Sequence, residues 1–300
     1  MVHQTIQRLG MKLLIVGANG MLGNTLYRYF SNKYETIATS RSKSWSKDAL
    51  EGYDISDLEK FDKLLNEFKP DIVLNCVGII KQLKDSKDSI ISIRANALWP
   101  HQLLEICKKH KAKMIHFSTD CVFTGKVGNY HETDTPDSVD LYGTTKRLGE
   151  VVNDLNALTL RTSIIGHEIN TCVSLVDWFL SQKNECNGFS KAIYSGFPTI
   201  SIAKIIDEYL IEKLMKNEIH GLYHLSSDPI NKYDLLNIIA KEYNKNITIH
   251  KDEEFKIDRS LNSDKLRQLI HFKPRSWDEY VAEMHQDYQN LKDKRKEQCL

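Results

Sequence analysis

The 300-residue sequence has no long apolar run and no excess of charge of one sign. No stretch approaches the roughly 20 consecutive apolar residues that a membrane-spanning helix needs. The 41 basic and 40 acidic residues give a formal net charge of +1, which provides no general attraction to nucleic acid or to an anionic membrane. We therefore expect neither as a partner, and any partner has to be recognised by a local site.

Cysteine is scarce as well, and no two of its six occurrences form a close pair at the spacing of metal ligands. They are Cys76, Cys107, Cys121, Cys172, Cys186 and Cys299. This scatter predicts reduced thiols in a cytoplasmic protein and no metal site built from cysteine, and it leaves a need for Mg²⁺ open. Residues 1–10 lack the apolar region of a secretion signal, and we expect them, like residues 292–300, to be flexible ends.

What the sequence does contain is an alternation of short apolar runs and amphipathic segments from Met11 to Arg161. Such alternation is typical of an α/β fold with a doubly wound parallel sheet. The expected strands are Lys12–Val16, Thr36–Ser40, Ile72–Val77, Lys113–Ser118 and Leu158–Arg161. Because the alternation fades after Arg161, we assign residues 11–161 to one domain, with some later chain crossing back, and residues 162–291 mainly to a smaller α/β substrate-binding domain.

Several expected helices carry start or stop signals. One begins at Ser56, where Ser56 and Glu59 can form a capping box, and ends before Pro70. A long helical stretch covers Asp88–His110, and its apolar face either covers the sheet or pairs with a second copy of the chain in a homodimer. Later helices are expected near Ser201–Lys216, Lys232–Tyr243 and Ser276–Leu291.

The segment Leu13–Gly23, LLIVGANGMLG, carries the clearest signal. A buried strand is followed by Gly17, Gly20 and Gly23 where a helix should begin. Gly17 allows a sharp turn, Gly20 leaves room for a pyrophosphate, and Gly23 lets the helix pack close to the sheet. Free amides at the helix start then hold the anion. The motif predicts a Rossmann-type dinucleotide site, and the alternative is a glycine-rich turn that binds nothing.

Tyr142 and Lys146 lie four residues apart in what reads as the start of a helix, so both side chains project from one face. A neighbouring ammonium group lowers the pKa of a tyrosine from its usual value of about 10, which makes Tyr142 a usable proton donor. Alone, the pair would be read as a surface pair. Here it follows a strand that ends in Ser118, Thr119 and Asp120, and ligands bind at such strand ends in parallel sheets.

With these motifs the sequence resembles the extended short-chain dehydrogenases/reductases, and within them most closely the dTDP-4-dehydrorhamnose reductases. The likeness covers most of the chain after Met11. It is carried by GANGMLG (17–23), LNCVG (74–78), RANALWP (94–100), STDCVFTG (118–125), YHETD (130–134), YGTTKRLGE (142–150), RTSIIG (161–166) and GFPT (196–199). The STD-VF-G block combined with the Tyr/Lys helix is specific, whereas the glycine turn marks only the larger superfamily.

The resemblance implies that a nicotinamide cofactor delivers hydride to the C4 ketone of a nucleotide-linked 4-keto-6-deoxy sugar, for the synthesis of a deoxysugar of surface polysaccharide. It implies that Tyr142 protonates the emerging alkoxide, and that Lys146 binds the nicotinamide ribose and holds down the tyrosine pKa. Thr119 would hydrogen-bond the carbonyl oxygen, and Asp120 would help to fix the sugar. The alternative for Thr119 and Asp120 is a strand-end cap that satisfies backbone amides.

The segment after the second expected strand lacks an acid that would indicate NAD. Dinucleotide folds that prefer NAD place an acid about 20 residues beyond the glycines, but no acid lies between Glu35 and Asp48. Arg41 could pair with a 2′-phosphate, so we expect NADP(H), with NAD(H) and a solvated loop arginine as the alternatives. The other residues expected at the cofactor are Gly17, Asn19, Gly20, Met21, Leu22, Gly23, Asp54, Ile55, Cys76, Val77 and Gly78.

The further candidates for substrate binding are Arg161, Ile164, Thr199 and Arg259. A guanidinium fork suits phosphate oxygens, so Arg259 could meet a nucleotide diphosphate, and an ion pair with Asp258 or Asp264 is the alternative. Two positions depart from the family pattern. Cys121 stands where the family has an aromatic residue, and Ile164 where it has a tryptophan. Both lie near where the family holds its sugar, so they leave the sugar and the nucleotide open.

Two other functions stay open from the sequence. An epimerase or dehydratase of the same superfamily reduces and reoxidises its cofactor within one turnover, and dehydratases tend to place an acid directly after the threonine, as Asp120 is placed here. Some relatives instead bind the dinucleotide and regulate a partner enzyme. The presence of Thr119, Tyr142 and Lys146 favours the reductase over such a subunit.

Overall fold

The computed structural model describes residues 10–44, 46, 48–80, 88–169 and 172–291, so the flexible ends expected at 1–9 and 292–300 lie outside the described residues. The chain forms two compact units. The first contains the chain up to Ser118 together with Asp140–Leu160 and Ile206–Leu222. The second contains Thr119–Val139, Arg161–Ile205 and the chain from Tyr223 onward.

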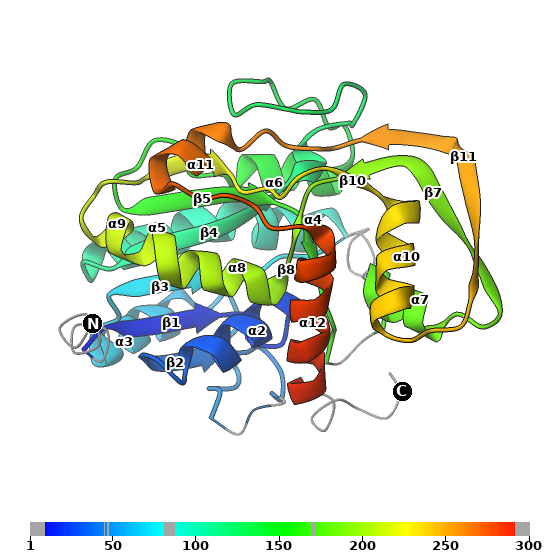
Figure 1. Cartoon of the computed structure of the whole chain (residues 1–300). Coiled ribbons are helices and arrows are strands. Elements are labelled where there is room, and N and C mark those ends of the chain that lie inside the picture. Colours follow the sequence, from blue (N-terminus) through cyan, green and yellow to red (C-terminus); the bar gives the residue numbers. More distant parts are fainter. Residues whose placement is uncertain (1–9, 45, 47, 81–87, 170–171, 292–300) are drawn as a thin grey trace. The chain divides into compact units, whose positions relative to one another are not determined.

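A six-stranded sheet organises the first unit and confirms the predicted parallel α/β fold (Figure 1). Its order is β2-β1-β3-β4-β5-β9, and β1 pairs in parallel with both β2 and β3, as β3 does with β4. The strands are β1 (Lys12–Val16), β2 (Glu35–Thr39), β3 (Ile72–Asn75), β4 (Lys113–Thr119), β5 (Ala157–Thr162) and β9 (Gly221–His224). The first five lie within two residues of the expected strands, because buried apolar runs bounded by polar residues mark them.

The first unit also contains helices, several of which bury apolar side chains. They are α2 (Met21–Phe30), α3 (Leu58–Phe68), α4 (Ser89–Ser92), the π-helix η2 (Ile93–Leu98), α5 (Trp99–Lys109), α6 (Leu141–Leu148), the π-helix η4 (Ile206–Leu210) and α9 (Ile211–Met215). Phe61 and Leu65 of α3 and Leu103 of α5 are fully buried in one cluster with Val73 of β3. This packing holds the strands whose ends carry the candidate cofactor residues.

One helix prediction needs correction, and a second is confirmed with an added detail. Helix α3 is capped by Asp57, whose side chain accepts from the Lys60 amide, rather than by Ser56. The Ser56 hydroxyl instead donates to the Asp54 carboxylate. The long stretch expected at Asp88–His110 is helical but passes through the π-helical turn η2 before Pro100. Such turns are frequent at functional sites, and the contacts described below explain this one.

The second unit contains a three-stranded sheet of order β10-β7-β11, in which β7 pairs antiparallel with β10 and parallel with β11. A two-stranded parallel pair, β6-β8, lies beside helix α8 in the chain. Its elements are the 3₁₀ turn η3 (Asp120–Val122), β6 (Ile164–Ile165), α7 (Leu175–Ser181), β7 (Glu185–Tyr194), β8 (Phe197–Pro198), α8 (Thr199–Ile205), β10 (Ile230–Asn231), α10 (Lys232–Glu242), β11 (Thr248–Asp258), α11 (Asp264–Ile270) and α12 (Trp277–Leu291).

The cysteines differ in part from expectation. Free thiols are carried by Cys76, Cys107, Cys121 and Cys186, but Cys172 is disulfide-bonded, so the prediction of reduced thiols throughout is wrong there. Scattered spacing gives no signal for a disulfide, because pairing depends on where the fold brings two cysteines. Cys299 lies outside the described residues.

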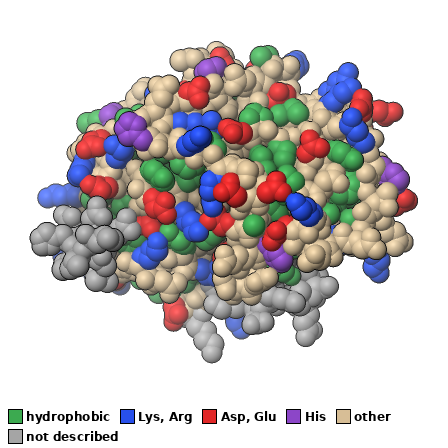
Figure 2. Space-filling model, in the orientation of Figure 1, with side chains coloured by type: hydrophobic (Ala, Val, Ile, Leu, Met, Phe, Trp, Pro, Cys, Tyr) green, Lys and Arg blue, Asp and Glu red, His purple; other side chains and the backbone are tan. Residues whose placement is uncertain are grey.

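The surface carries no dominant charge sign on the face drawn in Figure 2, where the described acidic and basic side chains are interspersed. In the part of the chain that the structure describes, no helix combines the length and the apolar character needed to cross a bilayer.

Candidate active site

The glycine turn of the first unit has the geometry that its spacing predicts. Gly17 adopts φ +98°, a left-handed conformation that favours glycine, directly after β1. A Cβ on Gly23 would lie 2.1 Å from the Gly17 carbonyl oxygen, so helix α2 starts against the turn. A Cβ on Gly20 would meet only that same oxygen, at an ordinary 3.6 Å. The chain itself therefore requires glycine at 17 and 23, whereas Gly20 faces space that the protein leaves open.

The start of α2 is equally open. Its N-cap is Gly20, no side chain caps it, and its first turn, which includes Met21 and Leu22, contains no acidic residue. The early amides of a helix have no partner within the helix, and with the helix dipole they bind anions. The side-chain oxygen of Asn19 in the same turn is buried without a partner among the described residues. This end of α2 fits the pyrophosphate of a dinucleotide.

The loop after β2 is tied to the glycine turn. The Asn19 amide donates to the Lys43 carbonyl at 3.1 Å and to the Ser42 hydroxyl at 3.4 Å. Arg41 lies exposed on this loop. Its charge reaches Asp54, although the pKa of Asp54 is lowered mainly by hydrogen bonds from Ser56. The loop thus presents a cation near the carboxylate expected at the adenine, and Ile55 packs on the core beside it.

The loop after β3 is fixed by Asn96, which the sequence analysis did not single out. The Asn96 side-chain oxygen accepts from the Ile79 amide at 2.8 Å, and its nitrogen donates to the Ile79 carbonyl at 3.0 Å. Asn96 lies in η2, and a Cβ on Gly149 would lie 2.0 Å from its carbonyl oxygen. The π-turn therefore brings η2 close to the end of α6 and aims an amide at the loop of Cys76, Val77 and Gly78.

Tyr142 and Lys146 both lie on α6, four residues apart. Lys146 is buried, and its ammonium group donates to the Phe117 carbonyl at 2.7 Å. A Cβ on Gly78 would lie 3.9 Å from that ammonium nitrogen, which places the lysine at the loop expected beside the cofactor. Burial lowers the pKa of Lys146 to about 8, against the opposing charges of Glu150 and Cys76.

Glu150, also missed from the sequence, is a buried carboxylate that accepts from the Ser118 hydroxyl at 2.6 Å. It lies two residues beyond the end of α6, so the helical spacing that identified the Tyr/Lys pair does not reach it. Its negative charge favours the protonated form of Lys146.

In the second unit, Thr119 ends β4 and caps the turn η3. Its hydroxyl oxygen accepts from the Cys121 amide at 3.1 Å, and the hydroxyl donates to the Asp120 carboxylate at 3.1 Å. The Asp120 side chain is buried, and burial raises its pKa while the charge of Arg259, the Thr119 hydrogen bond and the charge of Lys232 oppose the rise. Thr119 and Asp120 are thus a strand-end cap, and they also place polar groups directly after the strand.

Arg161 is buried in the second unit among aromatic and polar groups. Its guanidinium lies 5.2 Å from the centre of the Phe123 ring and 3.3 Å from His224. Phe123 stacks on Tyr130 with ring centres 4.1 Å apart. Burial and the Arg161 charge lower the pKa of His224 to about 3, so His224 is neutral and accepts from the guanidinium. This setting gives Arg161 a packing role whatever ligand the unit binds.

The remaining substrate candidates lie on separate elements. Ile164 is half-buried in β6 and pairs with Phe197 of β8, and Thr199 is buried at the first residue of α8. Arg259 follows β11, where its Nε donates to the Phe123 carbonyl at 3.0 Å and its Nη1 lies 3.6 Å from the Cys121 sulfur. Neither alternative ion pair forms among the described residues: the Asp258 carboxylate accepts from Ser260, and that of Asp264 accepts from Asn262.

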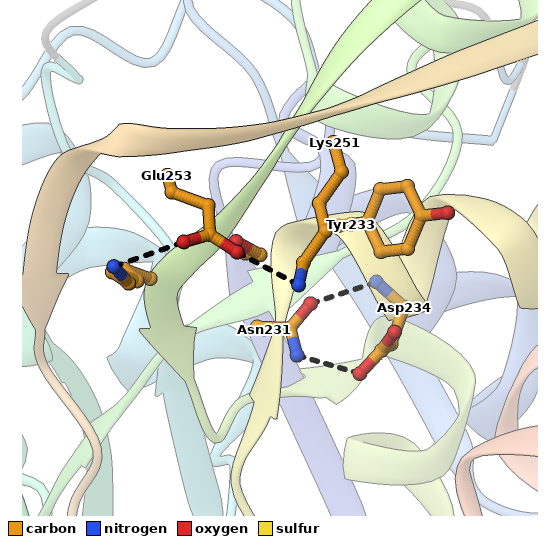
Figure 3. A pocket seen from close by; sticks show the side chains of 7 residues that line it. Asn231, Tyr233, Asp234, Lys251 and Glu253 are labelled. Atoms are coloured by element: carbon orange, nitrogen blue, oxygen red, sulfur yellow. Dashed lines mark hydrogen bonds and ion pairs between the residues drawn. The ribbon is translucent and has the colours of Figure 1, made fainter.

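A separate surface hollow of about 340 Å³ lies on the three-stranded sheet, as Figure 3 shows. Both of its lysines, Lys191 and Lys251, are paired with Glu253. Its charges are therefore satisfied, and it contains no residue that the sequence analysis proposed for the reaction. Within the described ranges, no group of three or more His, Cys, Asp or Glu side chains is arranged to hold a metal ion.

Comparisons with curated proteins find three kinds of relative. The chain is 32% identical over 161 residues to the probable low-salt glycan biosynthesis reductase Agl14 of Haloferax volcanii, a match of 52% of this chain and 54% of that protein, so the matched part spans about half of that relative's length. It is 28% identical to the dTDP-4-dehydrorhamnose reductase of Aggregatibacter actinomycetemcomitans, over 77% of this chain and 79% of that protein. It is 25% identical to methionine adenosyltransferase 2 subunit beta of Xenopus tropicalis, over 78% and 73%.

Solved structures share the fold. The dTDP-4-dehydrorhamnose reductase of Bacillus anthracis in complex with NADP superposes with a TM-score of 0.78 at 20% identity, covering 93% of this chain and all of that one. A hypothetical dTDP-4-dehydrorhamnose reductase from Sulfolobus tokodaii gives 0.74 at 25% identity, covering 89% and 98%. A family model described as "RmlD substrate binding domain" matches residues 11–290. The chain therefore belongs to the RmlD substrate-binding domain family.

Proposed function

We propose that this protein uses NADPH to reduce the C4 ketone of a nucleotide-linked 4-keto-6-deoxy sugar. The observation that carries the proposal is the placement of Lys146, a buried ammonium group held at 2.7 Å by the Phe117 carbonyl and next to Gly78. Burying an ammonium group is costly unless partners compensate it; Glu150 supplies a compensating charge, and two of the three ammonium donors still need partners. A ribose hydroxyl and a tyrosine phenolate are suitable partners.

The residues of the first unit would bind the cofactor and supply the proton. The open start of α2 and Gly20 would hold the pyrophosphate, and the loop of Cys76 to Gly78 would lie beside its middle. When bound, NADPH supplies the hydride. Tyr142 would donate its phenolic proton to the developing alkoxide, and the charge of Lys146 would stabilise the phenolate that remains.

In the second unit, Thr119 and Asp120 would bind the sugar. A threonine hydroxyl has one proton, and in this structure it is donated to Asp120. To polarise a ketone, the hydroxyl has to rotate from Asp120 toward the substrate, and Asp120 would then accept from a sugar hydroxyl instead. The cap seen in the structure is thus compatible with the proposed role.

For the cofactor, we propose a preference for NADP(H) over NAD(H). Arg41 supports it, because it is exposed on a loop that Asn19 ties to the glycine turn. No acid stands between Glu35 and Asp48, where folds that prefer NAD place one to accept from the ribose 2′-hydroxyl. Solved proteins of this fold include complexes with NADP and with NAD, so the choice depends on this loop.

The test is oxidation of NADPH with a dTDP-linked 4-keto-6-deoxy sugar, generated in place, for the wild type and for Tyr142→Phe. Turnover in the wild type, lost by at least about a hundredfold in the variant with NADPH affinity retained, supports the reductase. Tyr233→Phe, at the surface hollow, is the matched control and should keep full activity. Sugar conversion without net NADPH consumption would instead indicate an epimerase or dehydratase.

A regulatory subunit is the second candidate, because the chain is similar to the beta subunit of methionine adenosyltransferase 2 over 78% of its length. In that case Tyr142→Phe would bind NADPH and retain its biological effect in full. The intact set of Thr119, Tyr142 and Lys146 favours the enzyme.

We also propose a homodimer formed through α4, η2 and α6. Ile90 is 71% exposed and Leu148 is 60% exposed on these helices, and apolar side chains so placed suit a partner of the same chain. A sedimentation experiment on the wild type and on Ile90→Glu tests this, and a dimer unaffected by the glutamate would contradict it.

A further inference from the structure

Lys232 is a cation in the second unit that neither the sequence motifs nor the proposed mechanism uses. It is the first residue of α10, and its ammonium nitrogen lies 4.0 Å from the centre of the Tyr194 ring. It makes no hydrogen bond and no ion pair with any described residue. A lysine so placed is stabilised by the ring face, but its three donors are unused.

The small sheet explains how Lys232 and Tyr194 meet. Ile230 of β10 pairs with Tyr194, the last residue of β7. The chain then turns into α10 at Lys232. On the other side of β7, the Arg259 amide donates to the Ile193 carbonyl at 3.3 Å directly after β11. The end of the central strand is therefore flanked by one cation from each neighbouring segment.

Both cations influence Asp120 and Cys121 electrostatically or by contact. Arg259 approaches the Cys121 sulfur at 3.6 Å, and the charges of Lys232 and Arg259 both act on Asp120. In the part of the chain that the structure describes, neither Lys232 nor Arg259 forms an ion pair with Asp120. Both cations are half-buried, and two cations beside one carboxylate leave an excess positive charge that suits an anionic ligand.

Tyr194, over whose ring Lys232 lies, also carries a hydroxyl that lacks a partner among the described residues. The Tyr194 side chain is 4% exposed, its hydroxyl has no partner among the described residues, and its pKa is raised well above the usual value by burial and by the Asp120 charge. The hydroxyl is thus protonated. A buried polar group without a partner needs an explanation, and an absent ligand is one.

We propose that Lys232 and Arg259, with the Tyr194 hydroxyl as a neutral donor, form a subsite for anionic oxygens of the substrate. This rests on the proposed function, which makes the diphosphate of a nucleotide sugar the anion at hand. The subsite adjoins Thr119 and Asp120, and in a pyranose the anomeric phosphate lies one ring width from C4. A carboxylate on the sugar itself is the other source of the same chemistry.

Calorimetric titration of the full chain tests the subsite without any turnover. The probes are UDP and dTDP, with uridine and thymidine as the forms that lack phosphate, and UDP-glucuronate with UDP-glucose as the pair that differs in a carboxylate. The variants are Lys232→Met, Lys232→Arg and Arg259→Gln. Lys251→Met, which removes a lysine already paired with Glu253, is the matched control.

We expect Lys232→Met and Arg259→Gln each to weaken UDP or dTDP by at least tenfold, with Lys232→Arg near the wild type and Lys251→Met unchanged. Loss confined to UDP-glucuronate would support the subsite with a sugar carboxylate as its ligand. The subsite would be overturned if Lys232→Met and the wild type bound every phosphorylated probe with equal affinity. It would also be overturned if the wild type bound UDP and dTDP no better than uridine and thymidine. Failure of NADPH oxidation alone would overturn the proposed reaction and leave these binding results standing.

Discussion

The ammonium nitrogen of Lys146 lies 2.7 Å from the carbonyl oxygen of Phe117. This bond joins α6 to β4 in the first unit and fixes a buried cation beside the loop after β3. It satisfies one of the three ammonium donors, so the other two are left for groups that the protein or its ligands supply.

Replacing Lys146 with methionine should remove turnover and flatten the pH dependence of stability. The folded-state pKa of about 8 lies below the ordinary 10.5, so between these values the unfolded chain binds more protons. The wild-type free energy of unfolding should therefore rise with pH across this window, by about 3 kcal/mol at most. Below pH 8 the buried charge costs the wild type that amount; Lys146→Met loses this pH dependence, but it also leaves the buried Glu150 without that compensating charge.

Urea unfolding at pH 7 and pH 10 measures this difference. The exposed lysine Lys63 on α3 provides the control variant Lys63→Met, which should follow the wild type at both values. A Lys146→Met protein whose stability rises with pH as steeply as that of the wild type would contradict the argument.

The glycine turn offers a test that separates folding from binding. Gly23→Ala should destabilise the protein by about 1–3 kcal/mol or more, because its Cβ would lie 2.1 Å from a backbone oxygen that cannot move alone. Gly20→Ala has space for its methyl group and should fold normally, yet bind NADPH at least tenfold more weakly. Thermal melts measure the stability of Gly23→Ala, and fluorescence titration measures the NADPH affinity of Gly20→Ala. Wild-type affinity in Gly20→Ala would show that the pyrophosphate does not bind at this turn.

How far the sequence predicts this structure depends on the range of the interactions. The strands of the first sheet follow from local apolar runs, and Tyr142 with Lys146 follows from helical spacing alone. The cap of α3 was assigned to the wrong residue because Ser56 and Asp57 are adjacent and both can cap. The π-turn at η2 depends on contacts of Asn96 with Ile79 and Gly149, and no local pattern announces it.

The candidate substrate residues show the same division. Thr119 and Asp120 could be named from their motif, since they directly follow a strand. Lys232 and Tyr194 could not, because only the pairing of β10 with β7 brings them together. Arg259 was named for its chemistry, but its neighbours Phe123 and Cys121 come from a segment more than 130 residues away in the chain. Long-range pairing of this kind leaves no trace in one sequence.

Arg41→Ala tests cofactor preference. If Arg41 contacts the 2′-phosphate, its loss removes a charged hydrogen bond at an exposed site, about 1.5 kcal/mol or roughly tenfold in affinity for NADPH. Affinity for NADH should not change. Lys43→Ala, on the same loop, controls for general attraction of a polyanion. Equal weakening of NADPH and NADH in Arg41→Ala would show that the residue does not read the phosphate.

His224 should make the protein sensitive to acid. It is fully buried, its Nδ1 donates to the carbonyl oxygens of Tyr130 and Asn262, and its Nε2 accepts from Arg161. Burial holds its pKa near 3, below the ordinary 6.5, so between these values the unfolded chain binds more protons. The contribution of neutral His224 to the free energy of unfolding is therefore fully present above pH 6.5. It is lost progressively as the pH falls toward 3.

His224→Asn checks this contribution, since an asparagine amide can keep the Nδ1 hydrogen bonds but cannot be protonated in this range. At pH 7 the variant should be less stable by about 1–3 kcal/mol, because Arg161 loses an acceptor. Between pH 6.5 and pH 4 its stability should fall less steeply than that of the wild type, as measured by urea unfolding at half-unit steps. Parallel curves for the two proteins would mean that His224 is not the group protonated, and would direct attention to His116, whose pKa burial also lowers.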